Sequence, residues 1–167
     1  GVKRDHEFFD WRYNEVPFNK YDKFGFWVDG ILTAIIVYRK ELVKVATAYV
    51  IRIVELFGEQ SSLQKLVNGT ILSKRVSEGV GWVDWNCSNQ EICNYLKPIG
   101  FLTPEELYPA IVTIFTKPVD FYKKKYPYMF WSKDEKFFER LPPFHQWYVT
   151  KGDGDADRPN DNSGVRA

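Results

Sequence analysis

One segment, residues 28–57, constrains the fold of this chain more than any other. Its apolar side chains recur at the i, i+3, i+4, i+7 spacing of an amphipathic helix, and its polar face carries Arg39, Lys40 and Glu55 among others. Asp29 is suited to cap the start of such a helix, and Gly58 to end it. The spacing predicts one helix over about residues 30–57, roughly 40 Å long.

A strand interpretation of the same segment competes with the helix. The segment is rich in β-branched residues, and Val43, Val45, Thr47 and Tyr49 alternate as they would in a strand. A hairpin, however, needs a turn, and no Pro, Asn-Gly or Asp-Gly stands near the middle of the segment. The helix is therefore favoured.

Four short patterns predict further helix starts. Residues 61–64, 88–91, 103–106 and 132–135 each place Ser or Thr three positions before Glu or Gln, which is the spacing of a capping box. Seven prolines between residues 98 and 143 limit the second half to short helices, because proline breaks helix interiors. Together these features predict an all-α fold with one long amphipathic helix and several short capped helices.

Composition divides the chain into three zones. Residues 1–27 are polar but rich in aromatic rings, without a helix or strand period, and predict an extended N-terminal arm. Residues 28–149 are expected to form the helical core domain. Residues 150–167 contain no aromatic residue and predict a polar C-terminal tail that cannot bury itself.

Overall composition excludes several classes of protein. The chain has 167 residues, 44% of them hydrophobic, which suits one folded domain and excludes wholesale disorder. The formal net charge of +1 does not favour binding of nucleic acid through a basic face. The longest apolar run, residues 31–38, is too short to cross a bilayer, which needs about 20 residues. The first eight residues carry five ionisable side chains, so no signal peptide is expected there.

The cysteines and acidic residues do not predict a metal site, and no cofactor is expected. Cys87 and Cys93 lie six positions apart, which is compatible with a small disulfide loop or with two free thiols, and neither has a histidine nearby in sequence. Asp153, Asp155 and Asp157 open like a calcium loop, but the sequence then departs from that pattern. Two sequons, at Asn68 and Asn86, match the glycosylation pattern.

Catalytic patterns are equally sparse. His6 and His145 are the places where a general base could be proposed, but neither lies in a pattern that indicates a tuned pKa. The spacings of serine hydrolases, zinc proteases and nucleotide-binding loops do not occur. No catalytic residue is assigned, and the chain is predicted not to be an enzyme.

The unusual feature is the aromatic content of 17%, which suits contacts between chains. The predicted interface residues are Phe8, Phe9, Trp11, Tyr13, Trp82, Trp85, Tyr128, Phe130 and Trp131. A weaker hypothesis assigns nucleic-acid contacts to Lys40, Lys44, Arg52, Lys123, Lys124 and Lys125.

These observations predict a non-enzymatic structural subunit that self-associates or joins a larger assembly. A coat or nucleocapsid-like protein, or an accessory subunit of a large complex, would use an aromatic arm and ring-rich loops in this way. The alternative is a helical binding module for an apolar ligand or for nucleic acid.

Overall fold

A mixed β-sheet, rather than a helical bundle, organises the chain. The computed structural model describes residues 3–17, 19–43, 48–74, 78–103, 106 and 142–150. Over these residues the order is α1 (His6–Tyr13), β1 (Asp22–Val28), β2 (Ile31–Val43), β3 (Ala48–Gly58), α2 (Gln60–Thr70), η1 (Leu72–Lys74), β4 (Val80–Trp85), α3 (Gln90–Leu96), η2 (Lys97–Ile99) and η4 (Phe144–Gln146). Within this part of the chain the strands form one sheet in the order β1-β2-β3-β4, antiparallel except for the parallel pair β3–β4.

The prediction of an all-α fold with a long helix over residues 30–57 is wrong. That segment forms β2 and β3, which pair antiparallel from Ala34 opposite Gly58 to Val43 opposite Ala48. The connection between β2 and β3, residues 44–47, lies outside the described residues. A different turn is described at the start of the segment. Asp29 (φ 50°) and Gly30 (φ 78°) both have positive φ and connect β1 to β2, as an Asp-Gly hairpin turn does. Asp29 is therefore a turn residue and not a helix cap.

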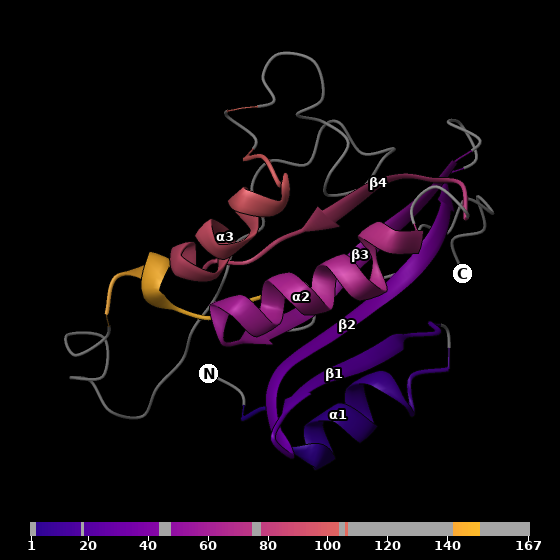
Figure 1. Cartoon of the computed structure of the whole chain (residues 1–167). Helices are drawn as coiled ribbons and strands as arrows, with labels where there is room; N and C mark the ends of the chain where they lie inside the picture. Colours follow the sequence, from indigo (N-terminus) through magenta and orange to yellow (C-terminus); the bar gives the residue numbers. More distant parts are fainter. Residues whose placement is uncertain are drawn as a thin grey trace.

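The apolar spacing resembled that of a helix because both faces of β2 and β3 are covered. Ile36 and Ile53 face a core shared with α2 and α3, whereas Val37 and Val54 face a second core shared with α1. A strand buried on both faces is apolar at nearly every position, so the helical spacing is also satisfied. Figure 1 shows α2 in front of the strands, α3 beside α2 beyond the end of β4, and α1 beside β1.

Residues 6–28 are part of this sheet structure and not an extended arm. Asp5 caps α1 by accepting a hydrogen bond from the backbone N–H of Phe8 at 3.1 Å. Phe8, Tyr13 and Tyr21 are buried together against the second core, and the rings of Tyr13 and Tyr21 pack edge to face. These three rings therefore contact their own domain, whereas Trp11 and Trp27 keep 60% and 62% of their surface exposed.

Several predicted helix starts are present, with shifted boundaries. The box at residues 61–64 corresponds to α2, which starts at Gln60, and the box at 88–91 corresponds to α3, which is capped by Asn89. Thr103 and Glu106 make the reciprocal bonds of a capping box. The box at 132–135 and the predicted tail after residue 150 lie outside the described residues.

Gly58, expected to end a helix, instead ends β3 and leads into α2. Its φ of 139° disfavours other residues, and a Cβ there would lie 2.3 Å from the Thr33 carbonyl oxygen. The glycine therefore allows α2 to turn back over β2 directly after the strand.

The parallel strands β3 and β4 separate at an irregularity in β3. Tyr38 of β2 pairs with Ile53 and Val37 with Glu55, so Val54 is an extra residue without an opposite number in β2. The last pair between β3 and β4 is Ile53 with Trp85, yet β3 continues to Gly58. Such bulges bend a strand and re-aim its side chains. The bulge thus coincides with the point where β3 loses its β4 partner.

A matched pair of isoleucine substitutions distinguishes the sheet from the long helix. Ile53 is fully buried and Ile31 is 67% exposed at the hairpin, whereas a helix over 30–57 would bury both. We expect Ile53→Ala to lower the free energy of unfolding by about 2–5 kcal/mol and Ile31→Ala by about 0.5 kcal/mol or less. Urea denaturation followed by circular dichroism measures both, and equal losses would contradict the sheet.

Candidate functional site

A buried carboxylate, Glu55, collects polar side chains from three distant parts of the chain. Its side chain is fully buried. The hydroxyls of Tyr13 and Tyr148 donate to it at 2.9 and 2.8 Å, and that of Thr150 lies at 3.4 Å. The guanidinium of Arg4 forms an ion pair with it at 3.3 Å. A buried charge needs this degree of pairing, because desolvation would otherwise disfavour it strongly.

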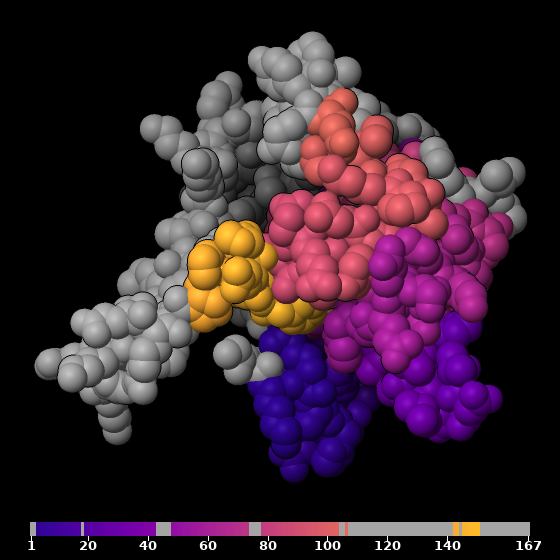
Figure 2. Space-filling view, turned by 60° about the vertical axis from the view of Figure 1, so that its left-hand side comes forward, coloured from indigo at the N-terminus to yellow at the C-terminus, as the bar shows by residue number. Residues whose placement is uncertain are grey.

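Local structure explains how these groups meet. Glu55 follows the bulged Val54, Tyr13 ends α1, and Tyr148 follows η4. Residues 147–150 are held beside the end of β4, where Cys87 and Thr150 form an isolated antiparallel bridge. Figure 2 shows residues 142–150 as an orange surface between the indigo surface of α1 and the salmon surface of α3.

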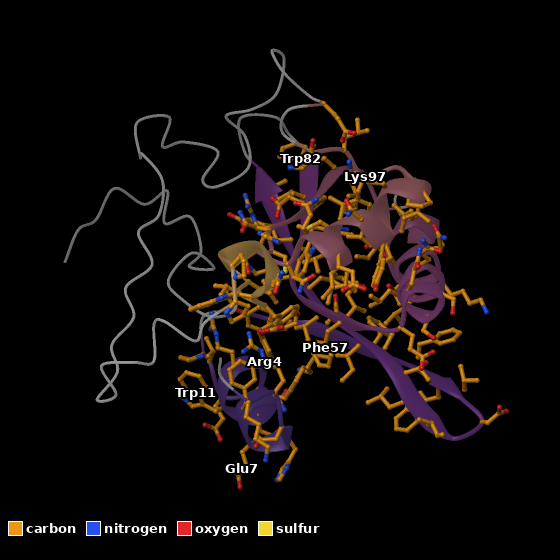
Figure 3. All side chains as sticks on the ribbon, turned by 90° about the vertical axis from the view of Figure 1, so that its left-hand side faces the viewer. Arg4, Glu7, Trp11, Phe57, Trp82 and Lys97 are labelled. Atoms are coloured by element: carbon orange, nitrogen blue, oxygen red, sulfur yellow. The ribbon has the colours of Figure 1, made fainter. Side chains whose placement is uncertain are left out.

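Arg4 completes the cluster from the N-terminal side. Its guanidinium lies over the ring of Phe8 at 4.9 Å and over the ring of Tyr148 at 5.2 Å. Figure 3 labels Arg4 between α1 and the sheet, with Glu7 and Trp11 on the outer side of α1. Arg4 thus balances the charge of Glu55 and stacks on the aromatic wall of the site.

Tyr148 also bonds the backbone of β3 beyond the last residue pair between β3 and β4. The Tyr148 hydroxyl accepts from the N–H of Leu56 at 3.1 Å and lies 3.2 Å from the Leu56 carbonyl oxygen. Had β4 continued, its backbone would have filled these positions. A side chain therefore takes the place of a strand at the edge of β3.

Burial shapes the acid–base behaviour of Tyr148. Desolvation first, and then the nearby negative charge of Glu55, raises the pKa of its hydroxyl above the ordinary value of 10.0. Tyr148 therefore keeps its proton at neutral pH and can donate it.

A cavity of about 280 Å³ lies on the α3 side of the β4 end. Its walls come from β4, from α3 and from the segment after η2, and include Trp85, Cys87, Cys93, Lys97 and Phe101. The walls thus combine aromatic, aliphatic and thiol groups with amide and hydroxyl groups and one ammonium group. Lys97 also reaches Glu106 at 3.5 Å, a pair that is about two-fifths exposed.

A second buried ionic cluster lies on the sheet. Arg52 of β3 pairs with Glu41 of β2 at 2.8 Å and with Asp84 of β4 at 2.9 Å, and Arg39 also pairs with Glu41. Arg52 is 2% exposed and Asp84 4%. This cluster crosses three strands and fixes their register through charge.

The predicted interface residues are dispersed by the fold. Phe8 and Tyr13 are buried, Phe9 is partly buried, and Trp11 is exposed, all on α1. Trp82 and Trp85 lie on β4 and not on a loop. Tyr128, Phe130 and Trp131 lie outside the described residues. Contact of these rings with other chains stays a prediction.

The residues of the nucleic-acid hypothesis do not form one described surface. Lys40 pairs with Glu78 at 3.0 Å, and Arg52 is enclosed by its carboxylate partners, so it offers little to a phosphate. Lys44, Lys123, Lys124 and Lys125 lie outside the described residues.

Neither histidine belongs to the Glu55 cluster. His6 is exposed at the start of α1, and His145 is exposed in η4. Both cysteines of the described chain are free thiols. The described residues hold no group of three or more metal-ligating side chains and no helix long and apolar enough to cross a membrane.

Sequence reasoning missed Glu55, Arg4, Tyr148 and Thr150 as a group. A usable signal existed at Glu55, which is an isolated acid between the apolar runs 53–54 and 56–57. A lone carboxylate in a strand that is otherwise apolar must find buried partners. The partners themselves, up to 95 positions away, carry no such signal.

Comparisons with known proteins give little. Searches of protein-family models and of curated proteins found no match. Among solved structures, the chain is similar to the ribosomal-protein-alanine N-acetyltransferase from Brucella melitensis biovar Abortus 2308. The identity is 10%, the match covers 60% of this chain and 76% of that chain, and the TM-score is 0.47. A likeness at this level does not carry an activity over.

These findings correct the functional predictions. The long helix that would have been the spine of a coat, nucleocapsid or accessory subunit is a pair of strands. The rings of α1 pack on their own sheet. The prediction of a structural assembly subunit built on that helix and an aromatic arm is therefore wrong, and the prediction that the chain is not an enzyme falls with it.

A substitution in the second ionic cluster tests whether its charges are buried. We expect Arg52→Ala to lower the free energy of unfolding by about 3–5 kcal/mol, because Glu41 and Asp84 would lose their shared partner. The matched control, Lys40→Ala, removes a more exposed pair with Glu78 and should cost about 1 kcal/mol or less. Chemical denaturation measures both, and equal effects would contradict the burial of the cluster.

Proposed function

We propose that this chain is an enzyme that transfers an acyl group from an amide-bearing donor to an amine or hydroxyl acceptor. The observation that carries the proposal is the edge of β3 beyond Ile53, where the backbone of Leu56 is bonded by a side-chain hydroxyl directly beside Glu55. Ligands of open α/β sheets commonly bind outside the carboxyl ends of parallel strands. Here these are the ends of β3 and β4.

The shape of this edge supports an elongated donor. An open strand edge offers alternating N–H and C=O groups, and an extended chain that carries amides complements it as another strand would. The Tyr148 hydroxyl, which reaches both the N–H and the C=O of Leu56, occupies the position that a donor amide would take. A donor would therefore bind by displacing or sharing this hydroxyl.

The polar groups support acyl transfer in particular. A backbone N–H at the β3 edge can donate to the donor's carbonyl oxygen and stabilise the negative charge that develops there. The acceptor attacks the carbonyl carbon, forming the new bond to it while the bond to the leaving group breaks. The acceptor releases one proton to solvent.

Tyr148 is placed to assist the leaving group by hydrogen bonding. Its raised pKa keeps the hydroxyl protonated, so it can donate a hydrogen bond to the leaving group, which takes its proton from solvent. Glu55 accepts a hydrogen bond from this hydroxyl and so positions it. Arg4 and Tyr13 in turn fix the Glu55 carboxylate.

The test uses the full chain with acetyl-coenzyme A, an acyl thioester whose carrier arm contains amides. Binding is measured by calorimetry, and turnover by chromatography of the released carrier with a panel of small amines, peptides and amino sugars. We expect Tyr148→Phe to lower turnover by about 100-fold or more, since it removes the hydrogen-bond donor. Tyr95→Phe removes an exposed hydroxyl that bonds Glu91 and should leave turnover unchanged.

The outcomes separate the parts of the proposal. Absence of binding at millimolar concentration would refute the donor site. Binding without turnover by any acceptor would reduce the site to a binding module. Turnover that Tyr148→Phe does not change would remove Tyr148 from the chemistry.

A further inference from the structure

Two free thiols line the cavity beside α3 and belong to no group described so far. Cys87 lies at the end of the β4 segment and Cys93 in the middle of α3, and both contribute to the cavity wall. The Sγ of Cys93 donates to the carbonyl oxygen of Cys87 at 3.7 Å. The fold therefore brings the two cysteines together across the start of α3.

The surroundings of the two sulfurs differ. The backbone N–H of Asn89 donates to the Sγ of Cys87 at 3.4 Å, and the same Asn89 caps α3 through its side chain. Hydrogen bonding with the Cys87 thiol, with a smaller contribution from Trp85, lowers the pKa of Cys93 to about 7 in spite of burial. The same contact and burial raise the pKa of Cys87. Cys93 is thus the more acidic of the two thiols, and Cys87 is its less acidic partner.

We propose that Cys93 and Cys87 form a peroxide-sensitive pair that closes to a disulfide in the wall of this cavity. The pairing rests on the contact between the two residues, their shared cavity and their free state, and it is independent of the proposed acyl transfer. Cys93 is the attacking thiol and Cys87 the resolving thiol.

The chemistry balances with a hydroperoxide as oxidant. The Cys93 thiolate attacks one peroxide oxygen, the O–O bond breaks, and the sulfur becomes a sulfenic acid while hydroxide or alkoxide leaves. The Cys87 sulfur then attacks the Cys93 sulfur, an S–S bond forms, and water leaves with the Cys87 proton. Two thiols are oxidised by two electrons, and one peroxide is reduced.

The disulfide would join two elements that now touch only through weaker contacts. Cys87 also pairs with Thr150 in the bridge that holds residues 147–150 beside β4. The cross-link would therefore tie α3 to that bridge and change the wall of the cavity. The oxidised and reduced proteins should differ in how this cavity admits small molecules.

The charged and titratable groups around Cys93 are few among the described residues. Lys97 follows α3 and lines the same cavity, Cys87 approaches from the β4 side, and Glu55 of β3 acts on Cys87. In a Cys87→Ser variant the hydrogen-bonding partner of Cys93 changes from a thiol to a hydroxyl, which alters its pKa. The pH profile is therefore measured on the wild-type chain, where Cys93 alkylation should rise with a midpoint near pH 7.

The decisive experiment treats the reduced full chain with one equivalent of hydrogen peroxide and follows intact mass and peptide maps. We expect a loss of two hydrogens with a Cys87–Cys93 cross-link, and cross-link formation at least roughly tenfold faster in the folded chain than in urea. Cys87→Ser should accumulate a dimedone-trapped sulfenic acid at Cys93, whereas Cys93→Ser should remain largely unmodified. Circular dichroism checks that both variants fold.

Other results would overturn the proposal. Stable addition of two oxygens to Cys93 in the wild-type chain, without a cross-link, would show that Cys87 does not resolve it. Equal oxidation rates of the two single variants would show that neither thiol is prepared by its surroundings.

Discussion

The extra residue at Val54 is the constraint on which the rest of the site depends. It shifts the register of β3 against β2 just where β4 stops, so that β3 runs on to Gly58 paired with β2 on one side and without β4 on the other. The backbone of Leu56 then needs a partner, because unpaired buried peptide groups are costly. Tyr148 supplies it. The extra residue at Val54 thus coincides with a strand edge that β4 leaves unpaired, and a polar side chain bonds the backbone at that edge.

Buried charge is the second constraint, and β3 carries it at two places. Arg52 binds carboxylates from the two neighbouring strands, and Glu55 binds Arg4 from before α1. Pairs of this kind stabilise little over an apolar core, but each is costly to break. The Arg52 pairs fix the register of the strands, and the Glu55 pair fixes where the segment before α1 lies. The Arg52 cluster therefore holds the sheet, and the Glu55 cluster holds the site.

The sequence predicted local features well and long-range ones poorly. The starts of α3 and of the box at Thr103 depend on side chains three positions apart, and these bonds are present. α2 starts near its predicted box, but its N-cap, Glu59, makes no side-chain cap bond. The long helix was wrong because strands covered on both faces are apolar at nearly every position. The Asp-Gly pair at residues 29–30 is a recognisable turn signal in the sequence, but Asp29 was interpreted as a helix cap.

The sequence by itself determined the features whose backbone partners are local, namely the helix caps and the hairpin turn at Asp29-Gly30. It also showed that the longest apolar run, residues 31–38, is too short to cross a membrane. Tertiary structure alone decided the site. Tyr13 lies 42 positions from Glu55 and Tyr148 lies 93 positions from it, yet both hydroxyls donate to the same carboxylate. Such distances close only after the sheet register and the bulge are set. The reason is physical, since a buried carboxylate specifies that partners must exist, but only the folded backbone selects which ones can reach it.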